Sequence, residues 1–243
     1  MSTKRDKFMI LQADVKGLEV VVAAWLSQDK TLYKELNDGV DLHGENQRIF
    51  GFSERVTAKI FKFKLLYGAM EYGFANDPDM NFISTSTKYW KKIIEKYYNK
   101  YQGIAAWHEK ICSQVGKTGI LTTPFGRTYK WDCMQYGSFK IPTTQVKNYP
   151  VQGTGADVVS IARVSLYRRW KQAGIEGCLI NTVHDSICLD VPNKSVDKSV
   201  ELLYNVFQDV PANISRIFNV NFDLSTKVEI LVGHDMYHLK EIK

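Results

Sequence analysis

Residues 178–191 read CLINTVHDSICLDV, and this stretch decides the fold. Two strand-like runs, at 178–183 and 187–191, are separated only by His184-Asp185-Ser186. In the second run apolar residues occupy every other position, which is typical of a strand with one buried face. The stretch therefore predicts a tight β-hairpin with His184, Asp185 and Ser186 at its tip.

A second strand is predicted near the N-terminus. Residues 8–13 are mostly apolar and stop at Asp14, and Gly17 then opens a segment of helical period. Most of the following sequence also has helical period, in segments at about 43–50, 53–69, 86–116 and 153–170.

The second half of the chain changes character. Residues 119–131 favour a hairpin, 195–207 a helix and 227–232 a last strand. We therefore expect an α+β chain. Its first few and last hundred residues build an antiparallel sheet, and a helical insertion lies between them.

The composition limits the classes of function. The 243 residues are 44% hydrophobic, and 32 Lys+Arg against 26 Asp+Glu give a formal net charge of +6. That excess suits a polyanionic partner such as nucleic acid. The longest apolar run, at 20–26, is too short to cross a bilayer, and the start has no signal-peptide pattern. We expect a cytoplasmic protein without membrane contact.

The cysteines predict neither zinc nor disulfide chemistry. No two of the four cysteines are separated by a C-x-x-C or other zinc-binding spacing. We therefore expect free thiols at Cys112, Cys133, Cys178 and Cys188.

Two aspartates at strand ends are candidates for catalysis. A carboxylate such as Asp14 or Asp185 at the end of a strand is usually a turn or cap residue. If the two strands are neighbours in one sheet, however, both carboxylates reach the same point. Two Mg²⁺ ions need such a pair in order to activate a 3′-hydroxyl and neutralise a leaving pyrophosphate.

The segment 53–69 carries a second candidate site. Arg55, Lys59, Phe63 and Tyr67 follow one another at four-residue steps, so on a helix they share one broad face. A guanidinium and an ammonium group one turn apart can grip a triphosphate, and the rings can stack on sugar and base. The alternative is an aromatic stripe that faces the core beside solvated basic residues.

Five motifs together resemble those of family A DNA polymerases, in identity, order and spacing. They are Asp14 with Glu19, then Asp41-Leu42-His43, then Arg55 to Tyr67-Gly68, then Val151-Gln152-Gly153-Thr154, and finally Val183-His184-Asp185. The resemblance covers almost the whole chain, up to a terminal Val228-Glu229-Ile230. Residues 59–68 and Tyr97-x3-Tyr101-Gln102-Gly103 are similar to the bacteriophage branch, which implies the cytoplasm of a host cell.

The resemblance implies a DNA polymerase I-like fold. Residues 1–16 would be the palm strand with motif A, 17–118 the mainly helical fingers with the nucleotide-binding helix, and 119–243 the palm with the motif C hairpin.

The resemblance also implies a role for each motif residue. Asp14 and Asp185, with the carbonyl of Val15, would bind two Mg²⁺ ions. His43, Arg55 and Lys59 would hold the triphosphate, with Lys59 also as the acid for pyrophosphate. Phe63 would pack on the sugar, Tyr67 would stand at the templating base, and Glu19 would exclude a ribose 2′-hydroxyl. The residues implied in binding primer-template DNA are Asn148, Gln152 and His184.

Two departures from the family pattern bear on these expectations. Ser186 follows the motif C aspartate where DNA polymerases of the family usually carry Glu, so one accessory carboxylate is expected to be missing. Motif A begins by residue 14, whereas in the family a thumb and usually an exonuclease domain precede it. We therefore expect either a split polymerase without a thumb, whose second polypeptide supplies the thumb and an exonuclease domain, or a decayed or excised fragment.

Two other functions stay open. A single-subunit RNA polymerase shares the fold and commonly has His-Asp-Ser in motif C, although Glu19 and Phe63 argue against it. A non-catalytic nucleic-acid-binding or assembly subunit is the third interpretation. The leading hypothesis is a DNA-templated DNA polymerase that uses dNTPs.

Overall fold

The computed structural model describes residues 8–132, 134–135, 138–139 and 141–242. The chain divides into two compact units, which are described separately. The first unit contains the chain up to Val21 and from Thr154 on, and the second contains 22–153. The predicted boundaries after residues 16 and 118 therefore differ from those of the units, and residues 119–153 lie in the second unit.

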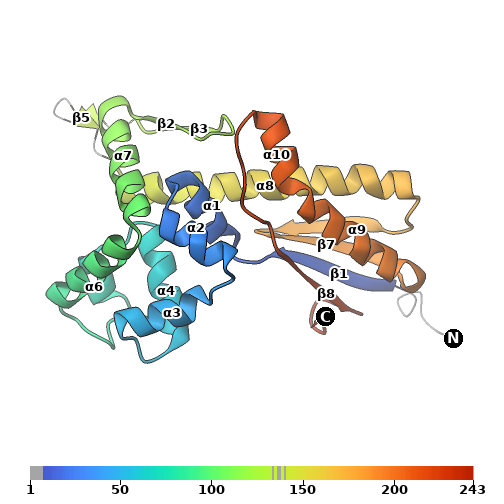
Figure 1. The fold of residues 1–243 in the computed structure, drawn as a ribbon, viewed down its shortest axis with the longest axis horizontal. Coiled ribbons are helices and arrows are strands. Elements are labelled where there is room, and N and C mark those ends of the chain that lie inside the picture. Colours follow the sequence, from blue (N-terminus) through green and yellow to red (C-terminus); the bar gives the residue numbers. More distant parts are fainter. Residues whose placement is uncertain (1–7, 133, 136–137, 140, 243) are drawn as a thin grey trace. The chain divides into compact units, whose positions relative to one another are not determined.

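The first unit is built on a five-stranded antiparallel sheet (Figure 1). In spatial order the strands are β6 (Cys178–Val183), β7 (Ser186–Pro192), β1 (Phe8–Val15), β8 (Val228–Gly233) and β9 (Lys240–Glu241). This confirms the predicted sheet of the first few and last hundred residues. The predicted last strand at 227–232 is followed by β9, so it is not the last.

Helices cover one face of this sheet. After a 3-10 turn at Asn193–Ser195, α9 (Val196–Gln208) packs against β1, β7 and β8. Leu11 and Ala13 of β1 are fully buried, whereas Gln12 and Asp14 on the other face are half-buried. This alternation orients the Asp14 carboxylate toward the face opposite the apolar core.

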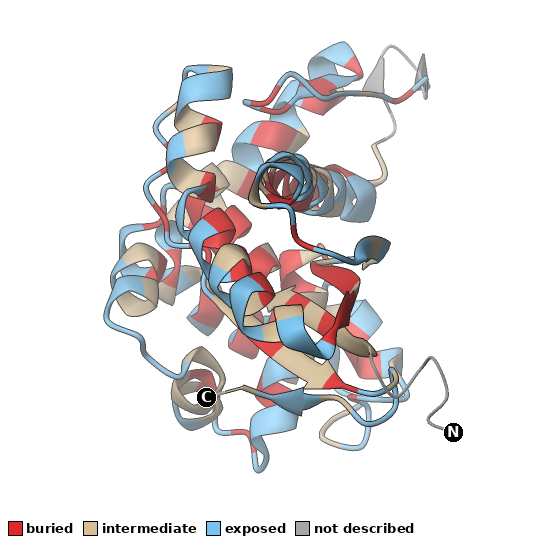
Figure 2. Cartoon of the chain, turned by 90° about the vertical axis from the view of Figure 1, so that its right-hand side faces the viewer, coloured by how far each residue is buried: buried red, intermediate tan, exposed pale blue. Residues whose placement is uncertain are grey.

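Three more helices belong wholly or partly to the first unit. They are α10 (Val210–Phe218), the end of α8 (Thr143–Ala173) from Thr154 on, and the start of α1 (Leu18–Ser27). Buried residues, red in Figure 2, lie on the inner faces of the elements, and exposed residues, pale blue, cover the outer faces.

The second unit is mainly helical. After the end of α1 its helices are α2 (Lys30–Asn37), α3 (Leu42–Phe50), α4 (Arg55–Leu66), α5 (Glu71–Asn76), α6 (Thr87–Lys100), α7 (Gln102–Thr118) and the start of α8. It also has two short hairpins, β2 (Ile120–Thr122) with β3 (Thr128–Lys130), and β4 (Met134–Gln135) with β5 (Ser138–Phe139). The hairpin predicted at 119–131 is thus confirmed.

Aromatic rings form the core of the second unit. Phe61 lies at its centre, with ring centroids 5.6 Å from Phe50, 5.1 Å from Phe74 and 6.2 Å from Trp90. All four rings are almost completely buried. This packing fixes the inner face of α4 and leaves its other face outward.

The stretch 86–116, expected to be one amphipathic helical segment, is two helices. The chain leaves helical geometry at Tyr101, with φ −110° and ψ 70°, and α7 begins at the next residue. The buried Asp29 carboxylate causes the break, because it accepts hydrogen bonds from the N–H groups of Gly103 and Ile104.

The structure bears on the predictions about the cysteine thiols and about membrane contact. Cys112, Cys178 and Cys188 are free, as predicted, and Cys133 lies outside the described residues. Cys178 is exposed, Cys112 is half-buried and Cys188 is buried. In the described part of the chain, no helix has both the length and the hydropathy to span a membrane.

Candidate active site

The sheet of the first unit brings the two predicted catalytic aspartates together. Val183 pairs with Ser186, so the hairpin turn consists of His184 and Asp185 alone. The predicted three-residue tip is therefore one residue too long. His184 adopts a left-handed conformation, with φ 50°, as a two-residue hairpin of the favoured type requires. The N–H of Val15 donates to the Asp185 carbonyl at 3.1 Å, which ties the turn to the end of β1.

The Asp14 carboxyl titrates far from its ordinary range. Burial, followed by the like charge of Asp185 and a hydrogen bond to its side chain, raises the pKa of Asp14 to about 6. Glu229 raises this pKa further, and Lys16 partly counteracts the increase. Two neighbouring carboxylates repel each other when both are ionised. The pair is therefore stabilised either by a proton on one of them or by a bound cation.

Glu229 is a carboxylate that sequence reasoning missed. It is the direct partner of Asp14 in the register between β1 and β8. The Lys16 ammonium lies 3.2 Å from Glu229 and 3.4 Å from Glu241. Only the strand register reveals this position, because nothing in the sequence shows which residue of 227–232 is opposite Asp14.

Ser186 closes the hairpin turn instead of joining the carboxylates. It is buried, and its hydroxyl donates to the Val183 carbonyl at 3.0 Å. The position next to the motif C aspartate thus has a structural role in this chain.

The donor set fits Mg²⁺. In the described residues no cluster of three or more His, Cys, Asp or Glu side chains could hold a metal. Mg²⁺ is usually bound through one or two carboxylates, with waters and substrate phosphates in the other positions. The Asp14 and Asp185 pair meets that requirement, and the raised pKa of Asp14 shows an acidic site that a cation would stabilise.

The second unit carries the predicted nucleotide-binding residues on or beside α4. Arg55 and Lys59 are exposed, and Phe63 is half-buried. The ring of Phe63 lies 6.3 Å from that of Tyr67 and 6.1 Å from that of His43. The predicted common face therefore exists, and α3 adds His43 to it. On this face the basic side chains Arg55 and Lys59 are exposed and the ring of Phe63 is half-buried, so the face is neither wholly buried nor wholly solvated.

Arg55 is engaged in an ion pair that was not predicted. Its Nε and Nη2 atoms each donate to a different carboxylate oxygen of Asp41 at 2.8 Å. Asp41 is also the N-cap of α3, where it accepts from the N–H of His43 at 3.2 Å. The Arg55 guanidinium holds the pKa of Asp41 far below its usual range. A triphosphate would compete with Asp41 for the Nε and Nη2 atoms, or bind the remaining N–H donors of this guanidinium.

His43 is neutral at pH 7. Burial and the nearby cations Lys62, Arg55 and Lys59 lower its pKa to about 4. In the described part of the chain, its buried Nδ1 atom has no hydrogen-bond partner. His43 can therefore offer a hydrogen bond, but no charge, to a ligand.

The other predicted residues are divided between the units. Glu19 and His184 belong to the first unit, where Glu19 lies half-buried in the first turn of α1. Asn148 and Gln152 belong to the second unit, one turn apart on α8, where Gln152 is exposed and Asn148 half-buried.

The sequence model of DNA polymerase family A matches residues 1–238. The chain belongs to DNA polymerase family A. Membership confirms the family named from the five motifs, while the bacteriophage branch stays a prediction.

Several curated family A enzymes are similar to this chain. The thermostable DNA polymerase I of Thermus filiformis is 28% identical over 97% of the chain and 28% of its own length. DNA polymerase I of Bacillus caldotenax is 26% identical over 96% of the chain and 26% of its own length. DNA polymerase I of Streptococcus pneumoniae is 25% identical over 83% of the chain. The chain thus spans about a quarter of these relatives.

A solved structure of the family shares the fold. It is the POL domain of Pol1 from M. smegmatis in complex with DNA primer-template and dNTP. The TM-score is 0.78 at 22% identity, over 93% of this chain and 40% of that one. The α+β architecture is therefore that of a DNA polymerase I polymerase domain.

Proposed function

We propose that this chain is the catalytic part of a DNA-templated DNA polymerase, which transfers deoxynucleotides to the 3′-hydroxyl of a primer. The observation that carries the proposal is the placement of Asp14 at the end of β1 beside the turn that holds Asp185, where burial and then the like charge of Asp185 raise the pKa of Asp14 to about 6. Two neighbouring acids are not required in a structural turn, whereas they are the ligands that a cation site requires.

The first unit would hold two Mg²⁺ ions through Asp14, Asp185 and the carbonyl of Val15. When bound, the ions supply activation of the primer hydroxyl and neutralisation of the pyrophosphate charge. The sheet provides rigidity, because β1 carries Asp14, β7 follows Asp185, and the bond from Val15 to Asp185 joins them.

The second unit would bind the incoming dNTP. Lys59 is exposed for the triphosphate, and Arg55 would exchange Asp41 for a phosphate in the same two-pronged geometry. The rings of Phe63 and Tyr67 would face sugar and base. Lys59 would donate the proton that pyrophosphate takes up.

Several finer assignments are part of the proposal. They come from the family resemblance. They are the palm and fingers names, the contacts of Asn148, Gln152 and His184 with DNA, and the second polypeptide that carries a thumb and an exonuclease domain. The resemblance also assigns to Glu19 the exclusion of a ribose 2′-hydroxyl, and this role would separate the proposed function from that of an RNA polymerase.

Primer extension tests the proposal. With labelled primer-template, Mg²⁺ and dNTPs, we expect Asp14→Ala and Asp185→Ala each to lower the rate by about 10³-fold or more, since each removes a metal ligand. Asp190→Ala, at the far end of β7, should stay within about threefold of the parent chain. At about 20 mM NaCl, where the chain alone is expected to bind DNA, no dNTP incorporation by the parent chain, or activity of both variants within tenfold of it, would exclude this function. Incorporation of rNTPs in preference to dNTPs would indicate an RNA polymerase.

A further inference from the structure

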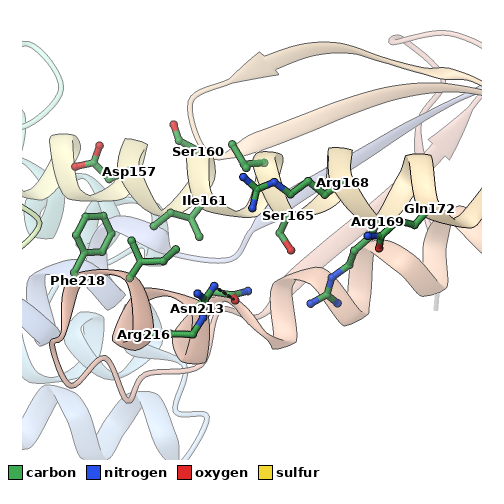
Figure 3. Close-up of a pocket in the computed structure, with 12 residues that line it drawn as sticks. Asp157, Ser160, Ile161, Ser165, Arg168, Arg169, Gln172, Asn213, Arg216 and Phe218 are labelled. Atoms are coloured by element: carbon green, nitrogen blue, oxygen red, sulfur yellow. Dashed lines mark hydrogen bonds between the residues drawn. The ribbon is translucent and has the colours of Figure 1, made fainter.

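A groove lies within the first unit, between the end of α8 and α10 (Figure 3). Its volume is about 660 Å³, and all of its lining residues belong to 157–172 and 213–218. Along α8 these residues span about 22 Å, at 1.5 Å per residue. The α8 wall is therefore as long as four turns of a helix, whereas the α10 wall, at 213–218, spans about 8 Å.

The floor of the groove is aliphatic. Val164 of α8 is 47% exposed and Ile217 of α10 is 50% exposed, although both are large apolar side chains. Ile161 and Phe218 extend this surface toward the Asp157 end, as Figure 3 shows. Apolar side chains open on both walls of one groove indicate an interaction surface.

The charge of the groove is polarised. Arg168 and Arg216 are exposed, and neither forms an ion pair within the described residues. Arg169 also lines the groove, with its guanidinium 2.6 Å from the Asp209 carboxylate. The single acid in the lining, Asp157, lies at the opposite end from Arg169 (Figure 3). Charge complementarity therefore favours an occupant with negative charge beside Arg168 and Arg216.

We propose that this groove binds an acidic amphipathic helix of a partner protein. The apolar face of that helix would cover Val164 and Ile217, and its acidic residues would pair with Arg168 and Arg216. The observations favour protein over nucleic acid. Single strands bind to stacking platforms of aromatic rings, and duplexes need many phosphate contacts, whereas this floor is mainly aliphatic with two unpaired arginines. The proposal does not depend on nucleotidyl transfer.

The test uses the full chain and a designed peptide as the probe. The peptide is a fluorescein-labelled helix of about 18 residues with Leu at three- and four-residue spacing and Glu elsewhere. A second peptide carries Lys in place of every Glu. Fluorescence anisotropy should show saturable binding of the Glu peptide with a Kd on the order of 10 µM. The Lys peptide should bind at least about tenfold more weakly.

Variants of the groove locate the binding. Arg168→Glu combined with Arg216→Glu, and separately Ile217→Asp, should each weaken binding of the Glu peptide by about tenfold or more. The matched control is Arg163→Glu, an exposed arginine of α8 outside the groove, which should bind like the parent chain. Circular dichroism spectra identical to the parent's show that each variant is folded.

Three results would overturn the proposal. They are no saturable binding of the Glu peptide, equal loss of binding in the Arg163→Glu control, and insensitivity of binding to the groove variants. A labelled single-stranded DNA that binds here while the Glu peptide does not, and that loses affinity in the double arginine variant, would assign the groove to nucleic acid instead.

Discussion

Burial and the neighbouring acids Asp185 and Glu229 move the pKa of the Asp14 carboxyl well above its ordinary value. Its pKa of about 6 lies well above the roughly 3.9 of an unfolded chain. The folded protein therefore binds a proton more tightly than the unfolded chain between about pH 4 and pH 6. Stability from this group is complete below pH 4 and is lost as the pH rises through 6.

We predict that Asp14→Asn stabilises the protein at pH 7 but not at pH 4, because it removes a partly buried charge and its repulsion by Asp185 and Glu229. Since Asp14 is half-exposed, the gain is reduced to about 1 kcal/mol, or 2–4 °C in Tm. Thermal unfolding of both proteins from pH 4 to 7.5 measures it. Added Mg²⁺ should raise the Tm of the parent chain but not that of the Asp14→Asn variant. A Tm difference independent of pH would contradict the assigned cause.

The pair of Arg55 with Asp41 leads to a second prediction for single residues. Asp41→Asn keeps a good N-cap for α3 but removes the charge that holds Arg55. Because both side chains are more than half exposed, the pair contributes under about 1 kcal/mol. The KM for dNTP in steady-state extension should therefore fall about twofold to fivefold. Glu45→Gln, which breaks the exposed pair with Arg48 on the same helix, is the control. An unchanged or higher KM would show that Arg55 does not bind the triphosphate.

At the level of elements, one buried carboxylate joins two helices of the second unit. Asp29 is the N-cap of α2, accepting from Leu32 at 2.9 Å, and also accepts from Gly103 at 2.7 Å and Ile104 at 3.2 Å. A Cβ on Gly103 would lie 2.6 Å from the Asp29 Cα atom. Only glycine permits this approach.

We predict that Gly103→Ala destabilises the protein by about 2 kcal/mol or more, because main chain rather than a flexible side chain must move. Gly116→Ala in the same helix meets nothing within 4 Å, so it should instead add about 0.5–1 kcal/mol through helix propensity. Urea unfolding of the two variants gives the comparison. Equal effects would show that the contact between Asp29 and Gly103 does not determine stability.

The same contact shows where sequence reasoning succeeds and fails. The alternation in 187–191 and the apolar run at 8–13 predicted their strands, but β7 is buried on both faces and not on one face alone as its alternation indicated. The helix break at Tyr101 could not be predicted, since its cause, Asp29, is more than 70 residues away. The candidate site, like the fold, could be predicted only in part. Asp14 and Asp185 were visible at strand ends, whereas Glu229 opposite Asp14 and Asp41 beside Arg55 depend on register and packing.

For the whole molecule, net charge limits binding to DNA. Affinity for phosphates falls steeply with salt, and a protein that makes about six phosphate contacts loses roughly 10³-fold between 50 and 200 mM. The net excess of +6 already counts the acids that pair with Lys16, Arg55 and Arg169. It matches the charge of only about six phosphate groups, so primer-template is held weakly at physiological salt.

We therefore predict that the chain alone extends primers well only at low salt. Between about 20 and 150 mM NaCl, the apparent affinity for primer-template should fall by more than about 100-fold, while the rate at saturating DNA changes little. Extension assays at several DNA concentrations separate the two quantities. A second polypeptide that supplies further phosphate contacts would restore extension at 0.15 M by raising affinity, not the saturated rate. Efficient extension by the purified monomeric chain at about 0.15 M salt would contradict this, because the chain would then hold DNA without help.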